Sequence, residues 1–452
     1  LFYFCLDIYS LSFISLPFEY AFGFFVFDEF NLFVMTITAM TFFFASVYAW
    51  GYVEALIEHG ELHRENLKLF YAAFSLLLTF INLALAANNL ALFLIFIELT
   101  TITGSLLIVT LNAKENIDAA IKYIFVTSTS MVFTLMGLIL LTRLTNGEHL
   151  DWAGLLANPP GDSPLLLMTF ILIIIGFLAK TGIAPFHTWL PHAHSMAPSV
   201  VSTVLSGTVL NVGFYGIIRL FSVVRNTVIG QTISQLLVFF GLLSMFIGVF
   251  SMLQQRDLKK LIAFSSIEQL GFMVIAVGVG TRESIFWVLY YMFAHSMIKA
   301  LLFLSAGILH RQYRGNEIAS MIDVIKLQPV ATLGLVVGGV AVVGIPPFAL
   351  FLPKFSILSE IGGVSLLVLG GVLFFFLLSI AAFAVILTQM VSQLPVHEDL
   401  DMIKLYRAPI GMRIPIIVLC ILVFAFGIML PESMVNLMSE IVNLLHLGDS
   451  NI

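Results

Sequence analysis

The sequence predicts an all-α, polytopic transmembrane protein, and three observations lead to this class. Of its 452 residues, 60% are hydrophobic and only 10% are charged, whereas soluble domains contain about 45–50% apolar and about 25% charged residues. Apolar stretches of about 20 residues, the length that crosses a bilayer as a helix, recur along the chain. So few charged side chains cannot cover a soluble surface, which excludes a water-soluble enzyme. The net charge of −6 does not indicate nucleic acid as a partner.

Apolar runs bounded by polar loops predict about 12–14 helices. These runs are 30–53, 66–87, 89–110, 117–142, 164–184, 197–222, 231–253, 258–280, 284–308, 329–361, 364–392 and 410–430, and residues 1–27 supply at most one more helix. The chain begins at Leu1 without Met or a signal peptide's basic region, so we expect a truncated N-terminus. Cys5 and Cys420 lie far apart in apolar surroundings and are expected to be small buried hydrophobes.

Two of these segments contain helix-breaking residues near the middle of the membrane. The segment 164–184 runs into Gly182 and Pro185, and 329–361 contains Gly344, Pro346 and Pro347. Interrupted helices at matching places indicate two five-helix repeats of opposite orientation, with the transport site at the breaks. We therefore expect N-terminal helices in 1–65, a first inverted repeat in 66–225, a second in 226–400, and a C-terminal helix and tail in 401–452.

The lysines and arginines of the loops predict the orientation. Alternating the loops places 13 cations at one end, against Arg143, Arg219, Arg225 and Arg282 at the other. The 13 are Arg64, Lys68, Lys114, Lys122, Arg256, Lys259, Lys260, Arg311, Arg314, Lys326, Lys404, Arg407 and Arg413. The positive-inside rule makes the first end cytoplasmic and puts the C-terminus outside, in the inner (cytoplasmic) membrane of a cell.

Charged residues inside the predicted helices indicate the function. Glu98, Lys180, Lys299 and Lys354 lie within apolar spans, and His295 precedes Lys299 by one helical turn. Each charge near the bilayer centre costs about 2.5–3.5 kcal/mol or more, so a reason for it is required. Burial disfavours a charged lysine and a nearby carboxylate favours it, so moving the carboxylate can switch the lysine. A line of such groups is typical of a proton relay.

Plainer interpretations of these residues stay open. Lys354 could extend its ammonium to the membrane surface, Glu98 could only join two helices, and His295 could be a packing residue. His187, His192 and His194 could be metal ligands, but the prolines and the lack of a nearby carboxylate disfavour this interpretation and favour an interfacial loop anchored by Trp189. We find no nucleotide, haem or zinc motif and therefore expect no cofactor and no metal in this chain.

Four segments together resemble a known family. They are KTGIAPFHTWLPHAHSMAP at 180–198, DLKKLIAFSSI at 257–267, HSMIKALLFL at 295–304 and GIPPF at 344–348. They are similar to the antiporter-like proton-translocating subunits of respiratory complex I, membrane-bound hydrogenases and Mrp antiporters, over about residues 25–430. The resemblance implies about fourteen helices in two inverted five-helix repeats, each with a broken helix.

The resemblance also implies roles for particular residues. Glu98 matches the family's channel glutamate and Lys180 its partner lysine. His295 and Lys299 match polar residues of the central connection, and Lys354 matches the residue on the exit side. Two departures concern the remaining site residues, Asn211 and Glu268. Asn211 stands where many relatives carry a bridging lysine, and Glu268 stands where respiratory relatives have a neutral residue or His, more as in hydrogenases and formate hydrogenlyase.

Three functional hypotheses follow. The first is a proton- or sodium-translocating subunit of a redox-driven complex, which implies other membrane subunits and peripheral iron–sulfur subunits as partners. The second is a subunit of a Mrp-type cation/proton antiporter without a redox partner. The third is a structural membrane anchor with a vestigial channel, which the presence of Asn211 suggests.

Overall fold

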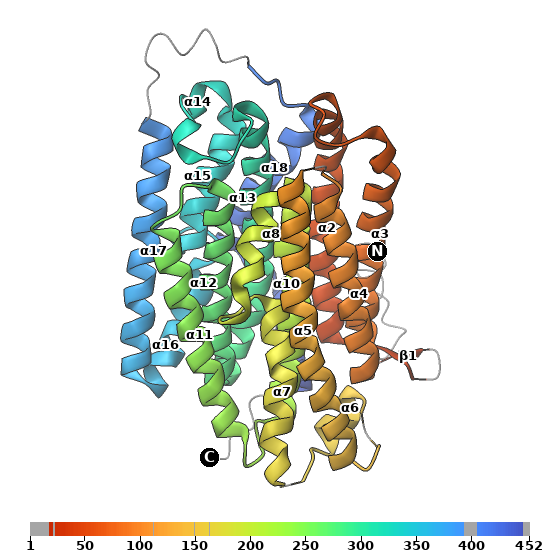
Figure 1. Ribbon diagram of the computed structural model, residues 1–452. Helices are drawn as coiled ribbons and strands as arrows, with labels where there is room; N and C mark the ends of the chain where they lie inside the picture. The colour runs from red at the N-terminus through yellow and green to blue at the C-terminus, as the bar shows by residue number, and fades with distance from the viewer. Residues whose placement is uncertain are drawn as a thin grey trace.

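Most of the chain consists of long helices that lie side by side. The computed structural model describes residues 18–20, 23–111, 113–148, 150–161, 163–392 and 405–445. Within them, 11 helices are long and apolar enough to cross a membrane, and Pro329–Val343 is a shorter apolar helix. The predicted class, a polytopic helical membrane protein, is confirmed (Figure 1).

The helices follow one another with short connections. The first part contains α2 (Glu29–Glu58), η1 (Arg64–Asn66), α3 (Leu67–Ala86), α4 (Leu90–Val109), α5 (Lys114–Leu144), α6 (Trp152–Ala157), α7 (Pro164–Thr181), η2 (Phe186–Trp189), α8 (Leu190–Met196), α9 (Ser199–Val204), η3 (Leu205–Val209) and α10 (Leu210–Val224). The second contains α11 (Gly230–Met252), α12 (Leu258–Val279), α13 (Arg282–Tyr313), η4 (Ile318–Ser320), α14 (Val324–Leu327), α15 (Pro329–Val343), α16 (Phe351–Val364), α17 (Leu366–Ser392), α18 (Ile410–Ile428) and α19 (Glu432–Leu444).

The two ends of the described chain depart from the predicted helices. Strands β1 (Phe18–Tyr20) and β2 (Phe25–Phe27) pair in an antiparallel hairpin just before α2. The rest of the possible helix in 1–27, and Cys5, fall outside the described residues, while Cys420 is partly exposed on α18. Helix α19 was not predicted, because 13 residues are too short for a span. Its apolar side packs against α2 and α13.

Burial separates the helices of the centre from those of the periphery. The most apolar windows of α13 and of the α9–α10 segment are completely buried by other helices. By contrast, only 28% of the most apolar window of α17 and of α18 is buried, and Leu366 and Leu367 are 79% and 85% exposed. Apolar side chains facing outward are suited to lipid, so the polar groups of interest can lie only on the inner helices.

The break in the first broken helix is stabilised by hydrogen bonds with side chains of neighbouring segments. Helix α7 ends at Gly182, whose φ of 78° is left-handed and favours glycine. The indole Nε1 of Trp189 donates a hydrogen bond to the Ala179 carbonyl at 3.0 Å, and Ser244 of α11 accepts one from the Ala184 amide at 2.9 Å. The backbone groups freed by the break are thus satisfied within the protein, as a bilayer requires.

The second broken helix uses a lysine for the same purpose. Helix α15 ends at Gly344, with a φ of 85°, and the Lys354 ammonium reaches back to the Val342 carbonyl at 2.9 Å. The Ala349 amide donates to the Val423 carbonyl of α18 at 3.1 Å. In Figure 1 the chain rises from α7 to α8 and descends from α15 to α16, so the two broken helices run in opposite directions. The boundaries of the two repeats stay a prediction.

Three cations that we assigned to loops are buried, so that part of the prediction was wrong. Arg219, Lys259 and Arg311 are 5%, 2% and 3% exposed. Arg219 pairs with Asp28 and Arg311 with Glu61, while Lys259 donates to a backbone carbonyl. Because the partners come from distant segments, a count along the sequence could not distinguish these cations from solvated ones.

The Asp28–Arg219 pair joins the start of α2 to α10. Asp28 is the N-cap of α2, where one of its carboxylate oxygens accepts from the Asn31 amide at 2.9 Å. Arg219 also donates to the Tyr215 hydroxyl at 3.0 Å, and its guanidinium lies 5.2 Å from the Phe30 ring centroid. Both charges are buried, so neither can exchange its partner for water.

We predict that Asp28→Asn lowers the free energy of unfolding by about 3–5 kcal/mol, because it leaves the buried Arg219 without a counterion. The thermal midpoint of the purified protein in detergent measures this effect. As a control, Lys326→Gln changes a cation whose side chain is 72% exposed, and should change stability by less than about 1 kcal/mol. Equal midpoints for Asp28→Asn and the parent would refute the prediction.

A second prediction concerns the helix break. A Cβ at Gly344 would lie 2.6 Å from Cδ of Lys354, and the left-handed backbone is itself unfavourable for alanine. Gly344→Ala should therefore lower stability by about 1–3 kcal/mol in the same thermal assay. Gly363→Ala is the matched control, because a Cβ at Gly363 meets no heavy atom within 4 Å. The prediction fails if both variants have the same midpoint.

Candidate functional site

Lys180 is completely buried in the last turn of α7. Its ammonium donates to Thr101 Oγ1 at 2.7 Å, to the Ile97 carbonyl at 3.2 Å and to the Tyr123 hydroxyl at 3.4 Å. Its acceptors are therefore neutral oxygen atoms of α4 and α5. Helix α7 places the ammonium there because α10 approaches closely at Gly213, where a Cβ would lie 3.1 Å from Cβ of Lys180.

Glu98 lies beside this lysine but does not contact it. Ile97 and Thr101, which accept from Lys180, flank Glu98 on α4, and the two charges interact electrostatically. Among the described ion pairs, none within 4.0 Å joins Glu98 to a cation. Glu98 Oε2 instead accepts from Ser128 Oγ of α5 at 2.8 Å, and Oε1 is buried without a protein partner. The carboxylate is thus near Lys180 but free of a direct bond to it.

Asn211 lies on α10 directly after a π-helical turn, η3, an irregularity that is frequent at functional sites. Its amide nitrogen donates to the Gly207 carbonyl at 2.9 Å and to Ser296 Oγ at 2.8 Å. Its Oδ1 is buried without a partner. Asn211 therefore links α10 to α13, and both of its amide hydrogens are in use.

Helix α13 carries two titratable groups one turn apart, His295 and Lys299, and both are completely buried. Lys299 donates to Ser265 Oγ and, at 3.1 Å, to the Ile262 carbonyl of α12. Both ring nitrogens of His295 lack a protein partner. Like Lys180, Lys299 is held by a hydroxyl and a backbone carbonyl of the neighbouring helix.

Glu268 is the buried carboxylate of the second half. It lies on α12, one turn after Ser265, and interacts electrostatically with both Lys354 and Lys299. Its Oε2 accepts from the amide of Gln269, and Oε1 has no protein partner. One carboxylate thus faces two lysines without a described ion pair to either.

Lys354 on α16 is 5% exposed. Besides its bond to the Val342 carbonyl, its ammonium lies 4.2 Å from the centroid of the Phe376 ring of α17. The alternative in which this side chain extends to the membrane surface is wrong, because the ammonium turns back toward the helix break.

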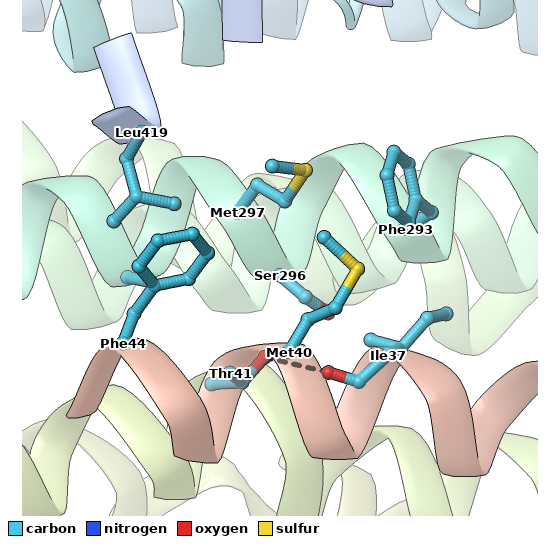
Figure 2. A pocket seen from close by; sticks show the side chains of 9 residues that line it. Ile37, Met40, Thr41, Phe44, Phe293, Ser296, Met297 and Leu419 are labelled. Carbon is cyan, nitrogen blue, oxygen red and sulfur yellow. Dashed lines mark hydrogen bonds between the residues drawn. The ribbon is translucent and has the colours of Figure 1, made fainter. Parts of the chain in front are cut away.

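A small apolar pocket lies between α2, α13 and α18 (Figure 2). Its two hydroxyl groups, of Thr41 and Ser296, donate to the carbonyls of Ile37 and Met292 within their own helices. The pocket therefore offers no free hydrogen-bond donor.

Of the seven residues singled out in the sequence, six are buried, on α7, α10, α12, α13 and α16, while Glu98 on α4 is partly exposed. Hydroxyl groups complete the arrangement, and we did not predict them. They include Ser128, Thr101, Tyr123, Ser265 and a contact of 3.1 Å between Ser206 and Ser266. Buried titratable groups joined by hydroxyls can pass protons, because hydroxyls both donate and accept hydrogen bonds.

Comparison with known proteins agrees with this architecture. The family described as NADH:quinone oxidoreductase/Mrp antiporter, TM, matches residues 87–379. A Hydrogenase-4 component F homolog of Methylacidiphilum infernorum is 30% identical over 92% of this chain and 87% of its own length. One subunit of the Na(+)/H(+) antiporter of Alkalihalophilus pseudofirmus is 26% identical over 64% of this chain and 58% of its own length.

A solved structure has the same fold. A chain of the membrane-bound sulfane sulfur reductase, an archaeal respiratory membrane complex, superposes with a TM-score of 0.85 over 98% of this chain and 88% of that chain. At 22% identity this similarity supports the fold alone. The family match covers more than half of the sequence, and the chain therefore belongs to the NADH:quinone oxidoreductase/Mrp antiporter family of membrane subunits.

Proposed function

We propose that this chain translocates protons, or alternatively sodium ions, across the membrane as an antiporter-like subunit of a redox-driven complex. The observation that carries this proposal is the environment of the three membrane lysines. Lys180, Lys299 and Lys354 are buried, and the hydrogen bonds of each ammonium go to neutral oxygens rather than to carboxylates.

Such an environment supports reversible protonation. A buried ammonium without a bound counterion holds its proton less firmly than an ammonium in an ion pair. A carboxylate that approaches it favours the charged form again. Glu98 near Lys180, and Glu268 near Lys299 and Lys354, are the carboxylates able to do this. A tenfold change in each protonation equilibrium requires only about 1.4 kcal/mol, a small demand on a redox reaction.

The similarity to a hydrogenase component supports redox coupling over an independent antiporter. That relative matches more of this chain, at higher identity, than the Na(+)/H(+) antiporter relative does. This chain has no cofactor motif, so we propose that other membrane subunits and a peripheral iron–sulfur arm perform the electron transfer. The cation-rich end faces the cytoplasm by the positive-inside rule, in an inner (cytoplasmic) membrane with the C-terminus outside.

Purification and assay of the intact complex distinguish the proposed function from its alternatives. Co-purification with iron–sulfur subunits, and proton uptake into inverted vesicles on addition of an electron donor, would support the redox-driven function. Purification only with other cation-antiporter subunits, and ion exchange without electron transfer, would support the Mrp-type alternative. Electron transfer without ion movement would support a structural anchor.

We predict that Lys180→Met slows coupled proton translocation by at least about 10²-fold, the usual loss when a proton-transfer group is removed. The quenching of a pH-sensitive dye in inverted vesicles measures the rate, and electron transfer and subunit content show that the complex has assembled. Lys326→Met, at an exposed site, is the control and should leave the rate unchanged. A normal ratio of protons to electrons in Lys180→Met would contradict the proposal.

A further inference from the structure

A large pocket opens at the cation-rich end of the bundle. It has a volume of about 1050 Å³, which includes its open mouth, and it lies where α2, α5, α8, α12 and α13 meet. Its lining residues include Tyr52, Glu61, Asn116, Ser195, Asp257, Lys259, His310 and Gly315. Because so many of them are polar, the pocket is suited to water rather than to lipid.

One charged group of this pocket is itself buried. Lys259 is 2% exposed, and its ammonium donates to the Ala197 carbonyl at 2.9 Å. Beside it, Asp257 accepts from Ser195 Oγ at 2.6 Å. The pocket therefore leads from the open end of the bundle to a buried ammonium and to the wall formed by residues 195–197.

His194 lies directly behind that wall. The residue is completely buried, its ring stacks on Phe303 of α13 at 4.8 Å between centroids, and neither ring nitrogen has a protein partner. It interacts electrostatically with Lys259 on the pocket side and with Lys299 in the row of titratable groups. A charged ammonium on either side repels a positive charge on this ring, so the ring can take up a proton for transfer only while Lys299 is a neutral amine. Its two unpartnered nitrogens then allow it to accept a proton on one nitrogen and release one from the other.

The route from the first half to Lys299 lacks such a group at Asn211. An amide does not titrate, and both hydrogens of this one are bound to Gly207 and Ser296. A proton that leaves Lys180 therefore meets a residue that cannot carry it. The central lysine needs a different supply, and the pocket and His194 offer one.

We propose that Lys299 receives its protons directly from the cation-rich end, through the pocket and His194, rather than from Lys180 by way of Asn211. This inference rests on the proposed function, in which Lys180 remains the switch on which Glu98 acts and is still required for translocation, although it does not itself supply protons to Lys299. In each transfer water in the pocket, which exchanges protons with the solution at the cation-rich end, gives a proton to the imidazole. The imidazole gives a proton to the neutral amine of Lys299 and is then neutral again, so no oxidant or co-reactant is consumed.

The first test is His194→Phe, which keeps an aromatic ring against Phe303 but removes both nitrogens. Coupled proton translocation by the assembled complex should fall at least about 10²-fold, the low end of the usual effect of a proton-transfer group. His192→Phe, two residues earlier on α8 and partly exposed, is the matched control and should keep the parental rate. A parental rate in His194→Phe overturns the route.

The second test blocks the pocket and does not depend on the folding of the first variant. A Cβ at Gly315 meets no heavy atom within 4 Å, so Gly315→Cys is tolerated, in a chain whose Cys5 and Cys420 are replaced by alanine. A bulky, membrane-impermeant thiol reagent applied to the cation-rich end should slow translocation at least about tenfold. Gly161→Cys is the control, because a Cβ there also meets no heavy atom within 4 Å. Gly161 lies between α6 and the start of α7, which are at the opposite end of the bundle (Figure 1).

Full labelling of Gly315→Cys without a loss of rate overturns the inference. Lys299→Met tells this failure apart from a failure of the proposed function. If Lys299→Met abolishes translocation while His194→Phe and the labelled Gly315→Cys do not, only the route is wrong. If Lys299→Met translocates normally, the proposed function itself is wrong.

Discussion

An ammonium group inside a bilayer needs oxygen atoms around it, and these must come from another helix, because the carbonyls of its own helix already accept hydrogen bonds. The arrangement of the inner helices follows from this constraint. Lys180 reaches α4, Lys299 reaches α12 and Lys354 reaches the end of α15. The helices that carry lysines therefore pack closely against helices with hydroxyls or free carbonyls, and mainly apolar helices such as α17 and α18 lie outside them.

The buried arginines and the buried lysines satisfy the same constraint in different ways. Arg219 and Arg311 each bind a carboxylate directly, and a guanidinium keeps its proton at any physiological pH. The three membrane lysines have neutral partners, with carboxylates held nearby but apart. The permanently charged arginines thus stabilise the fold. The lysines, which can lose their protons, lie where a nearby carboxylate can shift their protonation equilibrium.

Much of the fold could be predicted because its signals are local. Apolar runs locate the spans, and the Gly182–Pro185 and Gly344–Pro347 segments locate both breaks. Helix α19 and the β1–β2 hairpin could not be predicted, because each is too short for a hydropathy signal. Helix α19 packs against α2 and α13, and β2 packs against α3. Likewise, the burial of Arg219 depends on Asp28, which lies 191 positions away in the sequence.

For the site, residue types could be predicted but their partners could not. Glu98 and the lysines stand out because a charge in an apolar run is costly. Nothing in the sequence, however, indicates that Ser128 binds Glu98 or that Ser265 holds Lys299, since serines are common in membrane helices. His194 was considered only as a metal ligand or as part of an interfacial loop, because the lack of partners for its ring nitrogens can be seen only once its neighbours are placed.

The contact between Lys354 and the end of α15 has a mechanical consequence. The last carbonyls of a helix carry partial negative charge, and a cation placed there stabilises the helix end. The Lys354 side chain extends from α16 across Gly344 to the end of α15, so it links the two halves of the broken helix. When Lys354 loses its proton, this contact weakens. The protonation state of Lys354 therefore determines how rigidly α15 and α16 are held relative to each other.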